Sequence, residues 1–373
     1  MGWSIEDGRV LRGGALEEGR LGIEGGVIGA SGGRRFDASG LLVLPGIVDI
    51  HGDAHERCLQ PRPNVDFPAP FALADAAGQM LAAGITTAAL GVTLSWEPGL
   101  RSLATFRAVM AALEDPPPGP ELLVHLRWEA DNFEAEPDAL AAIGAGRIAT
   151  LGFNDHTPGI LRRLEDPKQL GKYAGRAGCS EAEFARLARA AAARRAEIPA
   201  SQERLAAACR ARGVPMLSHD DPRVEVRQAF RALGAATCEF PMAEAVAADA
   251  RVHGEAVVMG APNVVRGGSH LGWASAAPLA ERGLVTVLAS DYHWPALLAA
   301  PFRLAARGVL DLPAAWALVS RNPAHALALA DRGRIEPGLR ADLTLATPGG
   351  ALVAVFVAGA LAWLAPGAAA RLG

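Results

Sequence analysis

The chain has 373 residues, and half of them are hydrophobic, so it is long enough to bury a large core without disulfides or a structural metal. Charged residues make up 20% of the chain and the net charge is −4, which excludes disorder for most of the sequence and gives no basic excess for a nucleic-acid polymer. The four cysteines are scattered without a Cys-x-x-Cys pair, which favours reduced thiols in a cytoplasmic protein over a zinc ribbon or a redox dithiol.

Residues 1–44 contain short apolar runs separated by Gly-Gly turns at 13–14, 25–26 and 32–33, a pattern typical of a small all-β unit. The chain does not begin with a basic region followed by an apolar run, so we expect no signal peptide. A similar β pattern returns after residue 333, with apolar runs at 341–346 and 353–363. We therefore predict one β-sandwich built from residues 1–44 and 333–373, and a second domain formed by residues 45–332.

In residues 45–332, apolar strand candidates alternate with Ala-rich helix candidates. Eight such pairs over about 250 residues match the count of a (β/α)8 TIM barrel, an α/β fold. A doubly wound open sheet is the alternative, but no Gly-rich dinucleotide or phosphate loop follows the first strand. The expected strands are 46–50, 86–92, 122–127, 148–153, 214–218, 236–240, 256–259 and 284–289, and the expected helices include 72–83, 103–113, 181–195, 202–212, 223–233, 243–252 and 314–320.

One uncharged stretch, Ala351–Ala370, is long enough to span a bilayer. However, Gly359, Pro366 and Gly367 interrupt it, and its β-branched half, Val353–Val357, reads as a buried strand. We therefore predict a strand, a turn and a second strand in this stretch, and no membrane partner.

Polar residues gather where the expected barrel strands end, which is where the active site of a TIM barrel lies. The first strand ends at His51-Gly-Asp53, whose imidazole and carboxylate share one face of an extended chain. A lone polar residue at a strand end is more often structural than catalytic. Several carboxylates converging on one rim, however, repel each other unless a cation lies among them. The pattern predicts a divalent metal site among the residues at the other strand ends: Glu129, Asn154, His156, His219, Asp220, Asp221, Glu239 and Asp291.

After the seventh expected strand, residues 260–272 are rich in glycine and contain Asn263, Arg266, Ser269 and His270. Glycines allow close backbone approach, and a guanidinium group matches the geometry of phosphate oxygens. The segment therefore predicts an oxyanion or phosphate cradle. The alternative is a Gly-rich turn with a solvated arginine.

Two further basic segments are candidates for contacts with an anionic substrate. Arg62 is flanked by two prolines that could aim its side chain. Residues 157–180 hold both lysines of the chain, Lys168 and Lys172, together with several arginines and few apolar residues. This segment could be a lid over an anion or a solvated surface loop.

The chain resembles the amidohydrolase superfamily at Leu44-Pro-Gly-Ile-Val-Asp-Ile-His-Gly-Asp53, at Asn322-Pro-Ala, and at the return from Asp331 to Leu343. More specifically, it is similar to the diphosphatase family of phosphonate catabolism. The matching pieces run in order through nearly the whole chain: His51-Gly-Asp53, Pro61-Arg-Pro63, Gly84-Ile-Thr-Thr87, His125-Leu-Arg127 with Glu129, Asp155-His156, Ser218-His-Asp-Asp221, Glu239-Phe-Pro241, residues 259–270, and Ser290-Asp-Tyr292.

The resemblance implies a metal-dependent hydrolase that cleaves a ribose 5-triphosphate carrying a 1-methylphosphonate, leaving the 5-monophosphate and pyrophosphate. Asp53 replaces the second histidine of the superfamily pair, and Glu239 stands where a histidine ligand is usual. Both changes favour oxygen-binding metals. Zinc is the expected cofactor, as one or two ions, with manganese or iron as other options.

Within this resemblance, we expect His51, Asp53, His219 and Asp291 to bind metal, with Glu129 and His156 completing or bridging the site. Asp291 is the expected proton acceptor from water, and His219 is counted with it as catalytic. The phosphates are assigned to Arg62, Asn263, Arg266, Ser269, His270 and Lys172.

Two other functions are compatible with the sequence. The first is an amidohydrolase acting on a carbon–nitrogen bond, as a cyclic amide hydrolase or deaminase on the same fold. The second is a metal-binding, non-catalytic component of a phosphonate-processing complex. The sequence leaves the oligomeric state open, with a homodimer as one option.

Overall fold

The computed structural model of the protein describes residues 2–30, 32–268 and 274–373. Its centre is a sheet of eight parallel strands in the order β13-β12-β11-β10-β9-β8-β7-β6. A parallel bridge between Gly52 and Asp291 joins its two outer strands and closes the barrel. The predicted (β/α)8 barrel is therefore confirmed. Its strands are β6 (Ile47–Gly52), β7 (Ile85–Leu94), β8 (Glu121–Glu129), β9 (Thr150–Asn154), β10 (Met216–His219), β11 (Thr237–Glu239), β12 (Ala256–Gly260) and β13 (Val287–Ala289).

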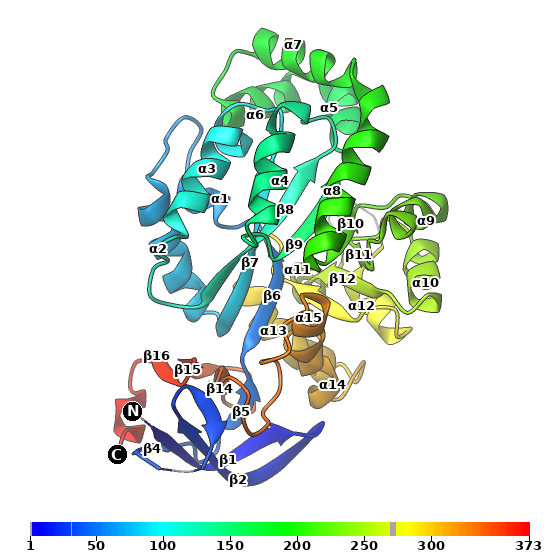
Figure 1. The fold of residues 1–373 in the computed structure, drawn as a ribbon. Coiled ribbons are helices and arrows are strands. Elements are labelled where there is room, and N and C mark those ends of the chain that lie inside the picture. The colour runs from blue at the N-terminus through cyan, green and yellow to red at the C-terminus, as the bar shows by residue number, and fades with distance from the viewer. Residues whose placement is uncertain (1, 31, 269–273) are drawn as a thin grey trace.

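Helices surround this barrel and cover its outer face (Figure 1). Many of their buried positions are alanine, which lets a helix pack closely on the strands. The helices are α1 (Glu56–Leu59), α2 (Ala69–Leu81), α3 (Leu103–Ala112), α4 (Glu136–Gly144), α5 (Thr157–Arg163), α6 (Pro167–Ala177), α7 (Glu181–Ala192), α8 (Ile198–Arg212), α9 (Val224–Leu233), α10 (Glu244–Val252), α11 (Ala261–Arg266), α12 (Ala276–Glu281), α13 (Pro295–Ala306), α14 (Leu312–Ala317) and α15 (Arg321–Ala326).

A second sheet is built from both ends of the chain, which lie close together in Figure 1. It holds β1 (Trp3–Arg12), β2 (Ala15–Glu24), β3 (Val27–Gly29), β4 (Arg34–Asp37), β5 (Leu42–Pro45), β14 (Leu343–Ala346), β15 (Leu352–Val357) and β16 (Ala360–Leu364). Its core includes Trp3 and Phe36, which contact Phe356 edge-on at ring-centroid distances of 5.4 and 5.8 Å. The domain boundaries at 44/45 and 332/333 stay a prediction.

The uncharged stretch near the C-terminus forms β15 and β16, joined by a tight turn at Ala358 and Gly359. Both turn residues have positive φ angles, 46° and 77°. Gly359 accepts this conformation without strain, and a Cβ there would meet Ile23 at 2.8 Å. The predicted strand, turn and strand are thus present. Among the described residues, no helix combines the length and apolar character needed to cross a membrane.

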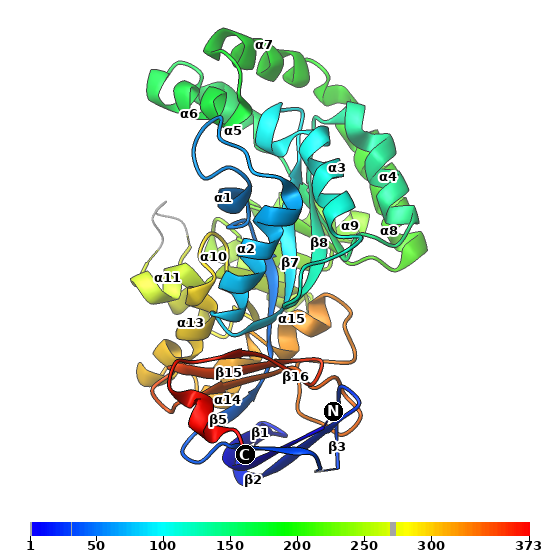
Figure 2. The same ribbon diagram turned by 90° about the vertical axis from the view of Figure 1, so that its left-hand side faces the viewer.

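Residues 157–180, which the sequence suggested to be a long loop, are mostly helical: they form α5 and α6. Asp166 caps α6 by accepting a hydrogen bond from the backbone N–H of Lys168 at 2.9 Å, and Gly178 ends it with a φ of 67°. Together with α7, these helices bury a small apolar cluster around Phe184. They lie at the end of the barrel opposite the terminal sheet (Figure 2).

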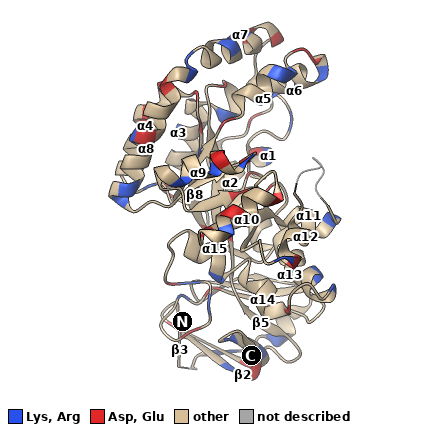
Figure 3. Ribbon diagram, turned by 90° about the vertical axis from the view of Figure 1, so that its right-hand side faces the viewer, with Lys and Arg blue, Asp and Glu red and all other residues tan. Residues whose placement is uncertain are grey.

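Acidic and basic side chains are interspersed over the outer helices. Lys and Arg (blue) alternate with Asp and Glu (red) along α4, α7 and α8 in Figure 3. Many of them form short-range ion pairs, such as Arg186 with Glu183 at 2.7 Å and Arg194 with Glu197 at 2.8 Å. Exposed pairs of this kind stabilise a fold little. The outer helices carry both charges and do not form a single basic face.

Candidate active site at the mouth of the barrel

A cavity of about 280 Å³ opens at the C-terminal ends of the barrel strands. Five residues predicted from the sequence lie together in its wall: His51, Asp53, His219, Asn263 and Asp291. The strands bring them together because the C-terminal ends of parallel strands meet at one rim of the barrel. The remaining lining residues are Arg127, Asp220, Phe240, Pro241, Met259, Gly260, Ala274 and Tyr292.

The glycine of the His51-Gly-Asp53 motif is required by close packing. A Cβ at Gly52 would lie 2.5 Å from Ser290 Oγ and 2.8 Å from Asp49 Oδ2. Those two atoms hydrogen-bond each other at 2.5 Å, and Ser290 N also donates to Asp49 Oδ1 at 3.0 Å. Asp49 thus ties the end of β6 to the end of β13, and so fixes His51 relative to Asp291.

The buried centre of the site is formed by His51, His219 and Glu239. Glu239 Oε2 is 2.7 Å from His219 Nδ1, and its Oε1 is 3.0 Å from His51 Nδ1. His219 and Glu239 are direct neighbours in the parallel register of β10 and β11. The two imidazole rings are stacked, with centroids 5.5 Å apart. The two oxygens of the Glu239 carboxylate therefore each contact one of the two rings.

These three residues fit a divalent cation. Each offers one ligand atom, and the atoms lie within 4.8 Å of one another. His51 Nδ1 and Glu239 Oε1 are buried, and neither has a hydrogen-bond partner of suitable geometry among the described residues. Burial lowers the pKa of His219 to about 3 and that of His51 far below its ordinary value, so both rings are neutral and have a free lone pair. Neutral imidazoles and a carboxylate are the donor types that zinc and related metals take.

A second group of possible ligands adjoins the first. His156, His219 and Asp220 also place one ligand atom each within 4.8 Å of one another. Glu129 holds His156 in place: its carboxylate accepts from the His156 backbone N–H at 2.6 Å and contacts Nδ1 at 2.9 Å. In this arrangement Glu129 supports His156, whose other ring nitrogen is left for a ligand.

Asp291 follows β13 with a φ of 56°, in the left-handed region that residues other than glycine rarely adopt. Its backbone is fixed by two hydrogen bonds across the barrel seam, to His51 O at 3.0 Å and from Asp53 N at 2.9 Å. Asp220 and Phe240, which follow β10 and β11, share the left-handed conformation, with φ of 58° and 51°. Three strained backbone positions on one rim are typical of a site where side-chain direction matters more than local stability.

Buried acids surround Asp291. Burial and, secondly, the nearby carboxylate of Asp53 raise the pKa of Asp291 to about 7. Burial also raises the pKa of Asp53 and of Asp220. Arg127 is the buried cation between them: it donates to Asp53 Oδ2 at 3.4 Å and lies 3.3 Å from His219 Nε2. A single guanidinium does not balance this many carboxylates, so the mouth of the barrel favours added positive charge.

The residues predicted to contact phosphate lie in different places in the structure. Arg266 lies in the last turn of α11, not in an irregular turn, and donates to Tyr292 Oη at 3.2 Å. It therefore contacts the cavity wall through Tyr292. Ser269 and His270 lie outside the described residues. Arg62 and Lys172 are exposed and are not in the cavity lining.

The final set of predicted metal ligands left out Glu239 and Asp220, although both were among the strand-end residues of the predicted metal site. Glu239 had been noted at its strand end, and Asp220 directly follows His219. Strand register is the signal that separates Glu239 from the other acids, because it places Glu239 beside His219. Arg127 belongs to a motif of the family but received no role in the predicted site, and it lies in the cavity wall beside Asp53.

A curated relative from Escherichia coli (strain K12), alpha-D-ribose 1-methylphosphonate 5-triphosphate diphosphatase, is 36% identical over 320 residues, which cover 83% of this chain and 84% of the relative. Solved structures of similar fold include N-acetylglucosamine-6-phosphate deacetylase from Pasteurella multocida, with a TM-score of 0.63 at 11% identity over 97% of this chain and 99% of its own. An amidohydrolase from an environmental sample of the Sargasso Sea has a TM-score of 0.63 at 15% identity, over 98% of this chain and 93% of its own. Both likenesses show the amidohydrolase fold. No family model matches the sequence.

Proposed function

The chain belongs to the family of alpha-D-ribose 1-methylphosphonate 5-triphosphate diphosphatases, and from this premise we propose that it hydrolyses that triphosphate to the 5-monophosphate and pyrophosphate. Water adds to phosphorus at the anhydride that joins the first two phosphates, and the P–O bond of that anhydride breaks. One proton of the water must be removed, and the pyrophosphate leaves as a polyanion. The protein must therefore supply a proton acceptor, positive charge and precise positioning.

The observation that carries this proposal is 36% identity across 83% of the chain. The site supports it, because an aspartate, a group of possible metal ligands and a buried arginine lie around one cavity. Hydrolysis of a carbon–nitrogen bond is supported only by the fold, and the fold alone does not specify the bond that is cleaved.

His51, His219 and Glu239 would hold the divalent cation, and His156 and Asp220 form a second group of possible ligands with His219. Asp53 and Asp291 line the same cavity and could complete either site. Zinc is our proposed metal because the donors are imidazoles and carboxylates; manganese and iron take the same donors. When bound, the cation supplies positive charge beside the phosphoryl group and makes a nearby water more acidic.

Asp291 is the proposed proton acceptor. Its carboxylate faces the cavity, and its backbone is fixed on both sides of the barrel seam. A carboxylate held this rigidly can accept the proton without reorganising, and later pass it to solvent through the open mouth.

Arg127 and Arg266 supply positive charge for the phosphates. Arg127 lies in the wall of the cavity, and Arg266 reaches it through Tyr292. Asn263 lines the same wall and has an amide that can donate to a phosphate oxygen. Phosphate contacts from Arg62, Lys172, Ser269 and His270 stay predictions.

The direct test is an assay of the purified, metal-reconstituted protein with alpha-D-ribose 1-methylphosphonate 5-triphosphate as substrate and pyrophosphate as the readout. We expect one pyrophosphate for each 5-monophosphate formed. Release of ammonia or an amine from a cyclic amide, without phosphate chemistry, would support the carbon–nitrogen alternative. Bound metal without hydrolysis of any ribose triphosphate would support a non-catalytic role.

Replacing Arg266 with alanine is expected to raise KM for the triphosphate about tenfold or more, because one charge-assisted contact to a phosphate is lost. The fold should not change, since Arg266 is exposed and, among the described residues, its side chain donates a hydrogen bond to Tyr292 alone. Steady-state kinetics of pyrophosphate release measures the effect. Arg212→Ala, which removes an exposed arginine at the end of α8, is the matched control and should behave as wild type. An unchanged KM in Arg266→Ala would remove this residue from the phosphate site.

Removing metal with a chelator is expected to abolish hydrolysis and to lower the melting temperature. A ligand that binds only the folded state stabilises it by mass action, and its loss leaves His51 Nδ1 and Glu239 Oε1 buried without partners. Differential scanning calorimetry before and after chelation measures the shift, and adding zinc back should reverse it. Equal melting temperatures with full activity in the chelated protein would contradict a metal site here.

A further inference from the structure

A second cavity, larger than the active-site cavity, lies at the opposite end of the same barrel strands. Its volume is about 620 Å³. The first residues of four consecutive strands line it, namely Met216, Thr237, Ala256 and Val287. The opposite ends of these strands lead into the active-site cavity. The strands are three to five residues long. At ~3.3 Å per residue, their length separates the two cavities by about 10–16 Å.

The ionisable side chains around this second cavity are all basic. Arg251 comes from α10, Arg321 and His325 from α15, and Arg334 from the segment that leads into the terminal sheet. None of the described residues that line the cavity carries a carboxylate. Three guanidinium groups stay charged at all physiological pH values, so the cavity concentrates positive potential.

Two of these arginines have no ion-pair partner within the described part of the chain. Arg251 donates only to the backbone carbonyl of Glu255, at 2.7 Å, and its Nε is buried without a hydrogen-bond partner. Arg321 makes one long contact, from Nε to Asn322 Oδ1 at 3.4 Å. Arg334 pairs with Glu336 at 3.0 Å through Nε only. Most of the donor capacity of the three guanidinium groups is therefore unused.

The contrast with neighbouring arginines is informative. Arg227 and Arg231, which lie beside this region, share the Glu255 carboxylate, and Arg231 also binds Asp249 at 2.6 Å. Acids are thus available close by, yet they neutralise these two arginines and not those of the cavity. Like charges that converge on one cavity raise the free energy of the fold unless an anion compensates them.

We propose that this second cavity binds a phosphate monoester. Guanidinium groups match phosphate oxygens in geometry and charge, and the volume suits a small organic molecule rather than a single inorganic ion. Pro215, Met216 and Val287 give the cavity an apolar wall for the organic part. The site is separate from the active-site cavity, and the inference does not rest on the proposed function.

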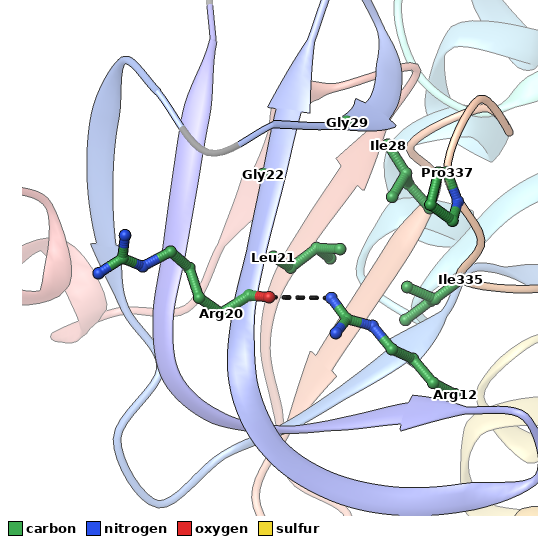
Figure 4. A pocket seen from close by; sticks show the side chains of 8 residues that line it. All are labelled: Arg12, Arg20, Leu21, Gly22, Ile28, Gly29, Ile335 and Pro337. Atoms are coloured by element: carbon green, nitrogen blue, oxygen red, sulfur yellow. Dashed lines mark hydrogen bonds between the residues drawn. The ribbon is translucent and has the colours of Figure 1, made fainter.

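A cavity on the terminal sheet provides a comparison, because its two arginines do not point into one common space. Arg12 and Arg20 line it, but Figure 4 shows the Arg20 side chain pointing away from Arg12. The guanidinium of Arg12 binds the backbone carbonyl of Arg20 at 2.9 Å, and that of Arg20 lies 3.6 Å from Glu6. These two cations do not face a common space, so we assign no ligand there.

The test uses the full-length protein with inorganic phosphate and AMP as probes and adenosine as the uncharged counterpart of AMP. Hydrogen–deuterium exchange with mass spectrometry locates binding, and titration calorimetry measures affinity. We expect AMP to slow exchange in residues 250–256 and 321–326, phosphate to do so more weakly, and adenosine not at all. If neither phosphate nor AMP protects these segments, or if protection is confined to the active-site cavity, the proposal is wrong.

The double variant Arg251→Gln/Arg321→Gln should weaken AMP binding at this cavity at least about a hundredfold, or tenfold or more for each lost charge-assisted contact. Its hydrolysis rate without added AMP should equal that of the wild type. Arg321→Lys keeps the charge and should retain part of the affinity, and Arg9→Gln, an exposed arginine of β1 outside both cavities, should retain all of it. Equal AMP affinity in the double variant and in Arg9→Gln would overturn the assignment.

Discussion

Replacing Glu239 with glutamine is expected to lower hydrolysis at least about a hundredfold and to reduce the bound metal to a small fraction of one ion per chain. The Glu239 carboxylate contacts His219 Nδ1 at 2.7 Å and His51 Nδ1 at 3.0 Å. Glutamine has nearly the same shape, but it carries no charge and replaces one oxygen by an amide NH2. That group cannot bind a cation, and loss of groups that only support a metal site already costs about 10–100-fold in affinity or activity.

Two measurements on the same preparation test this expectation: metal per chain after dialysis, and kcat for pyrophosphate release. Glu136→Gln is the matched control, since Glu136 is also buried but lies on α4 and pairs with Arg204 away from the cavity. The control should keep its metal and its activity. A Glu239→Gln protein that binds a full equivalent of metal would show that Glu239 is a structural bridge between two histidines and not a ligand.

The barrel could be predicted because its strands are buried apolar runs that alternate with Ala-rich helices. The predicted helix limits missed the first turn in two places. Helices α2 and α8 begin at Ala69 and Ile198, three and four residues before the predicted starts. Pro70 and Pro199 occupy these first turns, where proline is tolerated because no intrahelical N–H bond is lost. The predicted starts fall after these prolines and so leave out the first turn of each helix.

The helices α5 and α6 were missed for a different reason. Apolar residues are few here, but Leu170, Tyr173, Ala174 and Ala177 of α6 recur at helical spacing. The many basic residues favoured a lid or surface loop over this weak signal. Lysine and arginine are nevertheless good helix formers, and the few apolar side chains, such as Ile160 and Ala174, all face one buried cluster. Packing of this apolar face against α7 stabilises the two short helices.

In the site, the strand-end rule brought His51, His219 and Asp291 together correctly within one cavity. The rule could not rank the acids, because their distance from each imidazole depends on strand register. Register is a property of the pairing between strands far apart in sequence, and here it places Glu239, not Asp53, beside His219. Loop residues such as Arg62 were harder still, since tertiary packing alone decides where an exposed loop lies.

Replacing Asp291 with asparagine is expected to lower kcat by about 10²–10⁴-fold, the usual contribution of a positioned proton acceptor. In the metal-free protein, the same change should raise the stability. Burial and the carboxylate of Asp53 hold the pKa of Asp291 at about 7 in the folded state, against an ordinary value of 3.8. Between pH 4 and 7 the folded chain therefore binds a proton that the unfolded chain releases.

The sign of the pH dependence follows from this proton. Because the folded state binds more protons in that window, the free energy of unfolding falls as pH rises from 4 to 7, and the full penalty of a buried carboxylate is present above pH 7. Asparagine removes this penalty. The melting temperature of Asp291→Asn minus that of the wild type, measured with chelator present, should therefore be larger at pH 8 than at pH 5.

The two effects of Asp291→Asn together separate a functional role from a structural one. Replacing a residue that merely supports the fold would lower activity and stability together. Replacing Asp291 is expected to lower activity while it raises the stability of the metal-free chain. The matched control is Asp49→Asn, because Asp49 is also buried with a raised pKa, about 6, but accepts hydrogen bonds from Ser290. Asparagine keeps one acceptor oxygen but replaces the other with an NH2 group, so the control loses one of those bonds and should be destabilised at both pH values. If Asp291→Asn were destabilised to the same degree, its carboxylate would be part of the framework of the barrel seam and not the proton acceptor.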